Sequence, residues 1–207
     1  MSLEAMTTMM AKRWEEGSLL NTAESWRDSI TGADDFTKIA PRSGWALVSK
    51  DVLPDSTSKN YIEQTEVIIK ALKDAAFEDI ELPEEYAKAI IEWEEYYNTN
   101  FRGKTKVEID QLLNREGIKY AKQLSELKIN QLTRQSVQET IYDLAMYHDT
   151  YNNRRLLPNK YTWSNSCSSD GYLVRLGFFA ATGVIGYGLW FRARNRDVGV
   201  SLSRRVA

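Results

Sequence analysis

The chain has 207 residues, the length of one ordinary domain or two small ones. Apolar residues make up 43% and charged residues 27%, which is typical of a globular protein with a buried core. The net charge of −2 gives no general attraction to nucleic acid, so we expect no nucleic-acid partner. One Cys and one His exclude a disulfide framework, a cysteine zinc cage and a histidine-rich metal site, and we expect no cofactor.

The N-terminal residues do not form a secretory signal. Basic residues should precede an apolar run of about 7–15 residues. Here Lys12 and Arg13 come after the most apolar stretch, and Glu4 interrupts it. We therefore expect no cleaved signal, and the compartment stays open among the cytoplasm, a virion and the cell surface, with export by another route as a further alternative.

Charge and glycine are unevenly spread along the chain. From Gly171 to Ala207 there are six Arg and one acidic residue, a balance of +5, so the rest of the chain carries −7. The same stretch holds six of the eleven Gly. Such a shift in composition predicts a change of structural class, which we place near Pro158.

The first half is predicted to contain helices broken by turns. Residues 10–30 are expected to form one or two short helices, and residues 31–56 to be irregular except for a short strand at Trp45–Val48. A helix near 58–77 follows, because apolar residues recur at helical spacing and the residues Ser56–Ser58 offer an N-cap.

Further helices are predicted up to residue 148. Pro83 and two Glu favour a helix start, and the helix should run to about Asn98 on an apolar stripe at i, i+4, i+7 and i+11. The next helix should begin at Thr105 and end at Gly117, followed by a turn or two over 120–127. A last helix should run from a Thr133 cap to His148. The apolar stripe of the helix that starts after Pro83 consists of Tyr86, Ile90, Trp93 and Tyr97.

Residues 172–191 have two competing interpretations. They are about long enough for a transmembrane helix, and three Arg follow them, so a membrane partner through this segment is one hypothesis. Arg175 and four Gly weaken it, and the charge-free core is short. The other hypothesis is two short strands around a turn at Thr182-Gly183. The alternation of Val198–Val206 predicts one more strand and favours the sheet.

The C-terminal part resembles the end of C-type-lectin-like domains. It has Trp163-Ser164-Asn165 and a Ser-rich turn, then Asp170–Val174, a hairpin, an Arg/Asn loop and the closing Gly199–Val206. The most similar subgroups are the Fibrobacter-type paralogous domains and the target proteins of diversity-generating retroelements. The resemblance covers about residues 130–207, and the helix over 133–148 fits the helix that precedes this segment in the family.

The resemblance implies a binding surface without metal or catalysis. The acidic calcium ligands of the family are missing around Pro158 and Trp163, and one Cys cannot supply the paired cysteines of its formylglycine-generating relatives. By analogy, the ligand-binding residues would lie on the Ser-rich turn, the last hairpin and the Arg/Asn loop. They are Asn165, Ser168, Asp170, Tyr187, Trp190, Arg192, Arg194, Asn195 and Arg196.

Residues with chemical potential elsewhere are better explained by structure. His148 could act as a general base oriented by Asp149, but a His at the C-terminus of a helix is also explained by its favourable interaction with the helix dipole. Cys167 has no neighbouring cation to activate it. The Glu residues between 84 and 95 suit a solvated helix face, and the basic tail suits a protein partner or an ion pair with the acidic first region.

These observations predict an α+β protein. A mainly helical scaffold or oligomerisation region over 1–130 would precede a C-type-lectin-like recognition module over 131–207, and a homo-oligomer is left open. The leading hypothesis is a non-enzymatic recognition protein that presents an Arg/aromatic/Asn surface to a protein or glycan. The alternative is a tail-anchored membrane protein with a span near 172–191.

Overall fold

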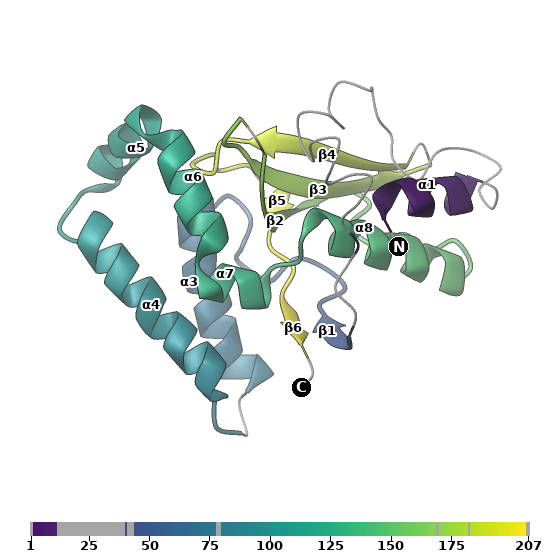
Figure 1. Cartoon of the computed structure of the whole chain (residues 1–207), viewed down its shortest axis with the longest axis horizontal. Coiled ribbons are helices and arrows are strands. Elements are labelled where there is room, and N and C mark those ends of the chain that lie inside the picture. Colours follow the sequence, from purple (N-terminus) through teal and green to yellow (C-terminus); the bar gives the residue numbers. More distant parts are fainter. Residues whose placement is uncertain are drawn as a thin grey trace.

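The computed structural model describes residues 2–11, 40, 44–77, 80–168, 170–181 and 183–205. Helices dominate up to residue 150 and strands dominate after residue 160, which confirms the α+β class (Figure 1). The first helix, α1 (Leu3–Ala11), was not predicted. Most of the expected helix over 10–30 lies outside the described residues. The short strand β1 (Ala46–Val48) is present as expected.

Helix α3 (Tyr61–Ala71) starts later than the sequence predicted. Its N-cap is Asn60, whose side chain accepts a hydrogen bond from Glu63 N while the Glu63 carboxylate accepts one from Asn60 N. This capping box satisfies two backbone donors at once, so it outcompetes the predicted cap in Ser56–Ser58. Ser56 is instead buried, and its hydroxyl donates to Leu53 O. A π-helical turn over Leu72–Ala76 ends the helix.

Helix α4 (Glu84–Asn100) follows Pro83 as predicted. Helix α5 (Lys106–Arg115) has Thr105 as its N-cap, and Glu108 completes a capping box. The role predicted for Gly117 is wrong: α5 ends before it, and Gly117 is the first residue of α6 (Gly117–Glu126). A Gly at that position leaves room for the Trp190 ring, which a Cβ would meet at 2.6 Å.

The cap predicted at Thr133 is also wrong. Thr133 is the last residue of a short helix, α7 (Lys128–Thr133), and its buried hydroxyl donates to Ile129 O. Helix α8 (Val137–Thr150) is capped by Ser136 in a capping box with Glu139. Ser136 is followed three residues later by Glu139, whereas Thr133 has no Glu at that spacing. A Glu three residues after the Ser or Thr is the signal that distinguishes a helix start from a Thr inside a helix.

The main sheet has four strands in the order β4-β3-β2-β5. The pairs β2–β3 and β3–β4 are antiparallel, and β2–β5 is parallel. The last strand, β6, pairs with β1 in a separate two-stranded sheet, so the strand predicted over 198–206 is two strands with a crossing between them. The bounds are β2 (Tyr161–Cys167), β3 (Leu173–Ala180), β4 (Gly183–Leu189), β5 (Val198–Gly199) and β6 (Ser203–Arg205).

The segment 172–191 is a strand pair in this structure. Strands β3 and β4 occupy it, with Leu173 opposite Leu189 and Ala180 opposite Gly183. At Gly177, φ is +145°, and a Cβ would lie 2.2 Å from Lys160 O, so only Gly allows this close approach of two strands. None of the helices that the structure describes has both the length and the apolarity of a membrane span.

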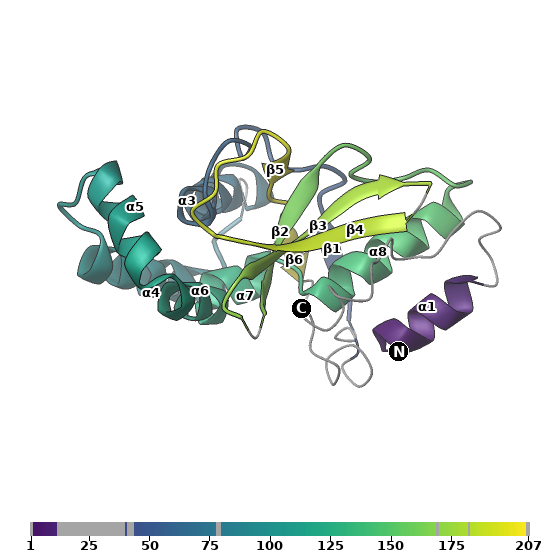
Figure 2. The same ribbon diagram turned by 90° about the horizontal axis from the view of Figure 1, so that it is seen from above.

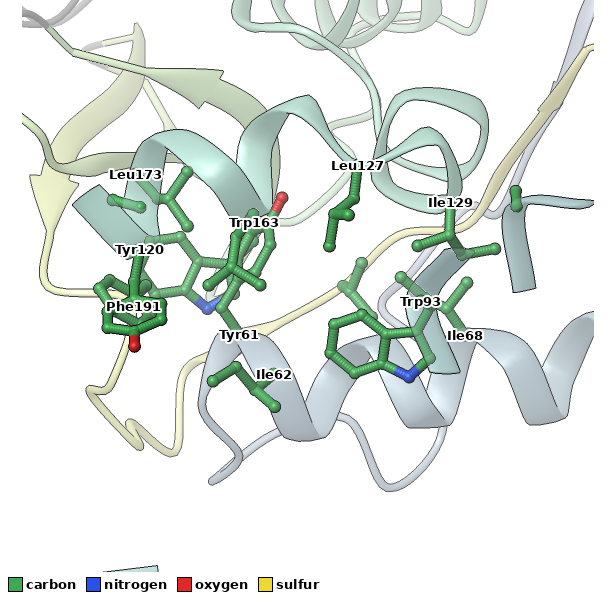
Figure 3. Packing of buried hydrophobic residues seen from close by; sticks show 14 of the residues in the cluster. Tyr61, Ile62, Ile68, Trp93, Tyr120, Leu127, Ile129, Trp163, Leu173 and Phe191 are labelled. Atoms are coloured by element: carbon green, nitrogen blue, oxygen red, sulfur yellow. The ribbon is translucent and has the colours of Figure 1, made fainter. Parts of the chain in front are cut away.

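Each face of the main sheet covers a separate core. Leu173, Trp163 and Val198 pack with α3, α4, α6 and α7 in the larger core, whose side chains Figure 3 shows. The neighbouring residue Val174 points into the other core, where Leu176, Phe179 and Val184 pack with α1 and α8. Figure 2 shows α8 running along the sheet with α1 beside it. The larger core therefore joins the helices before residue 130 to the strands after residue 160.

A buried arginine connects α3 and α7 behind this core. Arg134 is 2% exposed, and its guanidinium lies 3.7 Å above the Tyr61 ring. It donates to Asn130 Oδ1 at 3.0 Å, Tyr61 O at 3.1 Å, Thr65 Oγ1 at 3.3 Å and Gln64 Oε1 at 3.4 Å. All these acceptors are neutral. Burial lowers the pKa of Arg134 to about 10, so the side chain still carries its charge at neutral pH.

Arg134→Met should lower the free energy of unfolding by about 2–4 kcal/mol. The Met side chain fills similar space but removes all four hydrogen bonds and leaves the buried Gln64 Oε1 without a donor, and an unsatisfied buried acceptor alone costs about 1–3 kcal/mol. Urea unfolding measures the change, and Arg154→Met, at an exposed position nearby in the chain, is the matched control with an expected change below about 0.5 kcal/mol. Equal stability of the two variants would contradict this role for Arg134.

Candidate functional site

Two of the nine predicted ligand-binding residues are buried and have their side chains hydrogen-bonded to the backbone. Asn165 is buried on β2, and its side-chain amide donates to Arg134 O at 3.0 Å. Ser168 is buried in the turn after β2, where its hydroxyl accepts a hydrogen bond from Tyr172 N at 3.0 Å. Both side chains hold the sheet and its turns in place.

The aromatic pair Tyr187 and Trp190 does not form one platform. Trp190 is half-buried and meets the Tyr172 ring edge-on, with the centroids 4.9 Å apart. Tyr187 lies on β4 opposite Arg175 of β3, whose guanidinium is 5.7 Å from its ring, and it is 46% exposed. Tyr187 therefore offers a free surface, whereas Trp190 is largely used in packing.

The loop after β4 is tied to the helical region. Arg194 donates to Glu63 of α3 at 2.9 and 3.2 Å and to Asp110 of α5 at 3.2 and 3.3 Å. The carbonyl of Asn195 accepts a hydrogen bond from Ser58 N at 2.9 Å. Of the remaining predicted residues, Arg192 lies 5.9 Å from the Trp190 ring, and Asp170 and Arg196 are exposed.

Arg194 forms part of the wall of a groove between α3, α5 and α4. The groove has a volume of about 480 Å³ and brings the loop after β4 together with the exposed side of α3. Charged side chains of both signs line it, and apolar side chains lie among them. The lining residues are Ser58, Lys59, Asn60, Ile62, Glu63, Glu66, Val67, Lys70, Tyr97, Lys106, Ile109 and Arg194.

The two carboxylates of the groove differ in their surroundings. Burial alone would raise the pKa of Glu63, but hydrogen bonds from Arg194 and from Asn60 N outweigh it and hold that pKa below its usual value. Partial desolvation, followed by the charge of Glu63, raises the pKa of Glu66. Glu63 is thus held in its charged form by hydrogen bonds from Arg194 and from Asn60 N. Among the described residues, Glu66 has no hydrogen-bond or ion-pair partner.

Sequence reasoning found Arg194 but missed the rest of the groove. Glu63, Glu66 and Lys70 read as the solvated side of a helix, and nothing in their spacing indicates which distant loop they meet. One local signal was available: Asn60 and Glu63 have the spacing of a capping box, which fixes the orientation of the Glu63 carboxylate. The contact between α3 and the loop after β4 spans more than 130 positions and is set by the fold.

His148 and Cys167, the candidates for catalysis, lie in environments that disfavour their charged forms. His148 is buried at the end of α8 with its ring 5.4 Å from Phe179, and burial lowers its pKa. Burial also raises the pKa of Cys167, which disfavours the reactive thiolate. Within the described ranges, no group of three His, Cys, Asp or Glu side chains is placed to hold a metal ion.

Comparison with family models, curated proteins and solved structures gives no match to this chain. The site is therefore interpreted from its own geometry.

The stability supplied by Glu63 should depend on pH. Because its folded-state pKa is lowered, its contribution is present above the ordinary value of 4.5 and is lost as pH falls through the folded-state pKa. At neutral pH, Glu63→Gln should be less stable than the unmodified chain, and the difference should shrink below about pH 4.5. Urea midpoints measured across this range check it, with Glu94→Gln, at an exposed position in the interior of α4, as control. A difference that stays constant with pH would contradict the assignment.

Proposed function

We propose that this chain is a non-enzymatic recognition protein that binds a segment of a partner protein in the groove between α3, α5 and the loop after β4. The observation that carries the proposal is the groove itself, because it joins Arg194, one of the residues expected to bind ligand, to charged and apolar side chains of the helical region. Concave sites with a few placed polar groups are where proteins usually bind ligands.

The charges of the groove favour an acidic segment. Four basic and two acidic side chains line it, a local excess of +2 on a chain whose net charge is −2. Arg194 is already paired with Glu63 and Asp110, and Lys106 lies 3.6 Å from Glu63. Lys59 and Lys70 have no ion pair within the described residues and are available to carboxylates of a ligand.

The apolar part of the groove favours a protein over a glycan. Ile62, Val67 and Ile109 would contact an apolar side chain of the ligand. A glycan site would instead be expected to offer an aromatic face. Tyr97 is the aromatic residue of the groove, and its ring already packs against Trp93 at 5.9 Å and Phe101 at 5.7 Å between centroids.

The proposal is tested with a fluorescent peptide that alternates Glu and Leu. It should bind the full chain, more weakly at high salt, and Lys70→Glu should weaken binding by about tenfold because a repulsive charge replaces an attractive one. Lys122→Glu makes the same charge change on an exposed part of α6 and should leave the affinity unchanged. Absence of binding, or equal weakening by both variants, would overturn the proposal.

A further inference from the structure

Strand β4 forms one edge of the main sheet that the structure describes. It pairs with β3 on one side, and among the described residues no backbone or side-chain group pairs with the other. An edge strand presents a row of unpaired N–H and C=O groups, which is a template for another strand. Strand β4 is seven residues long, enough to form several such bonds.

The opposite edge of the sheet is protected in a way that β4 is not. Strand β5 has only two residues, and the Gln64 side chain donates to Val198 O at 3.2 Å. Just beyond it, Val200 N donates to Ser56 Oγ, and Leu53 N donates to Val200 O. Strand β4 carries no charged residue and no proline, the two residue types that usually guard an exposed edge.

We propose that β4 pairs antiparallel with β4 of a second copy of this chain, around a two-fold axis at Gly186. The sequence of the strand, Gly183-Val-Ile-Gly-Tyr-Gly-Leu189, is sterically complementary to itself in this register. Val184 lies opposite Gly188 of the other copy, Leu189 opposite Gly183, and Ile185 opposite Tyr187. Val184 and Leu189 thus each lie opposite a glycine, and the Ile185 and Tyr187 side chains pack against each other. No like charges lie opposite one another, because the strand has no charged residue.

The exposure of Tyr187 fits the same arrangement. It is 46% exposed although it sits in the middle of a strand, beside the guanidinium of Arg175. In the paired strands, Ile185 of the second copy would cover its open flank. The two sheets would join into one continuous sheet, and each dimer would contain two of the grooves described above. The dimer does not depend on what those grooves bind.

The test compares two double variants with the same number of substitutions. Ile185→Lys with Tyr187→Lys places two Lys–Lys pairs across the axis, and Ile185→Lys with Tyr187→Glu places two Lys–Glu pairs there. In sedimentation experiments the unmodified full chain should have twice the mass of a single chain. The dimer dissociation constant of the Lys/Lys variant should be at least about tenfold higher, and the Lys/Glu variant should remain dimeric. A monomeric unmodified chain, or equal behaviour of the two folded variants, would overturn the proposal.

A crosslinking measurement decides the question if the Lys/Lys variant does not fold. Cys167→Ser removes the native thiol, and Ile185→Cys and Tyr187→Cys are then made in separate chains. Directly opposite positions in paired strands lie within reach of a disulfide, whereas diagonal positions are too far apart. The mixture of the two chains should form an intermolecular disulfide readily, and each chain alone only slowly. Equal crosslinking in all three samples, or none, would exclude this register.

Discussion

The contacts of Tyr61 and Arg134 are the constraint on which the arrangement of this protein depends. The Tyr61 ring lies under the Arg134 guanidinium and forms a T-shaped pair with the Trp163 ring, with the centroids 5.7 Å apart. Its hydroxyl donates to Ser164 O, and its backbone N–H donates to Phe191 O. One residue at the start of α3 therefore contacts the residue that follows α7, strand β2 and the loop after β4. Because the Arg134 charge is buried among neutral acceptors, few other arrangements would satisfy it.

This constraint also explains how the groove arises. With α3 fixed against β2, the loop that leaves β4 passes over the N-terminal end of α3, where Arg194 reaches both Glu63 and Asp110. The capping box of α3 orients the same Glu63 carboxylate toward the loop. The site proposed for ligand binding is thus a product of long-range packing. Its charged side chains belong to elements that are distant in the sequence, and the helical region contributes more of them than the C-terminal region does.

Local signals in the sequence predicted the elements better than their contacts. The cap at Thr105, the helix start at Pro83 and the short strand predicted at Trp45–Val48 follow from local chemistry, and all are present, the strand over Ala46–Val48. Errors arose where two neighbouring signals competed, as at Thr133 and Ser136. The crossing of the chain from β5 to β6 could not be predicted, because the alternation of residues 198–206 does not tell which partner strand each half will find. The boundary near residue 130 and the lectin-like resemblance stay predictions.

The central claim is that the helices before residue 130 and the strands after residue 160 share one core and open together. Native-state hydrogen exchange of the backbone amides in α3 and β2 tests it most directly, because it measures the free energy of opening for each element separately. A common value for both elements, close to the free energy of global unfolding, is the predicted result. Exchange of the α3 amides at a much lower free energy than those of β2 would mean that the helical region opens on its own.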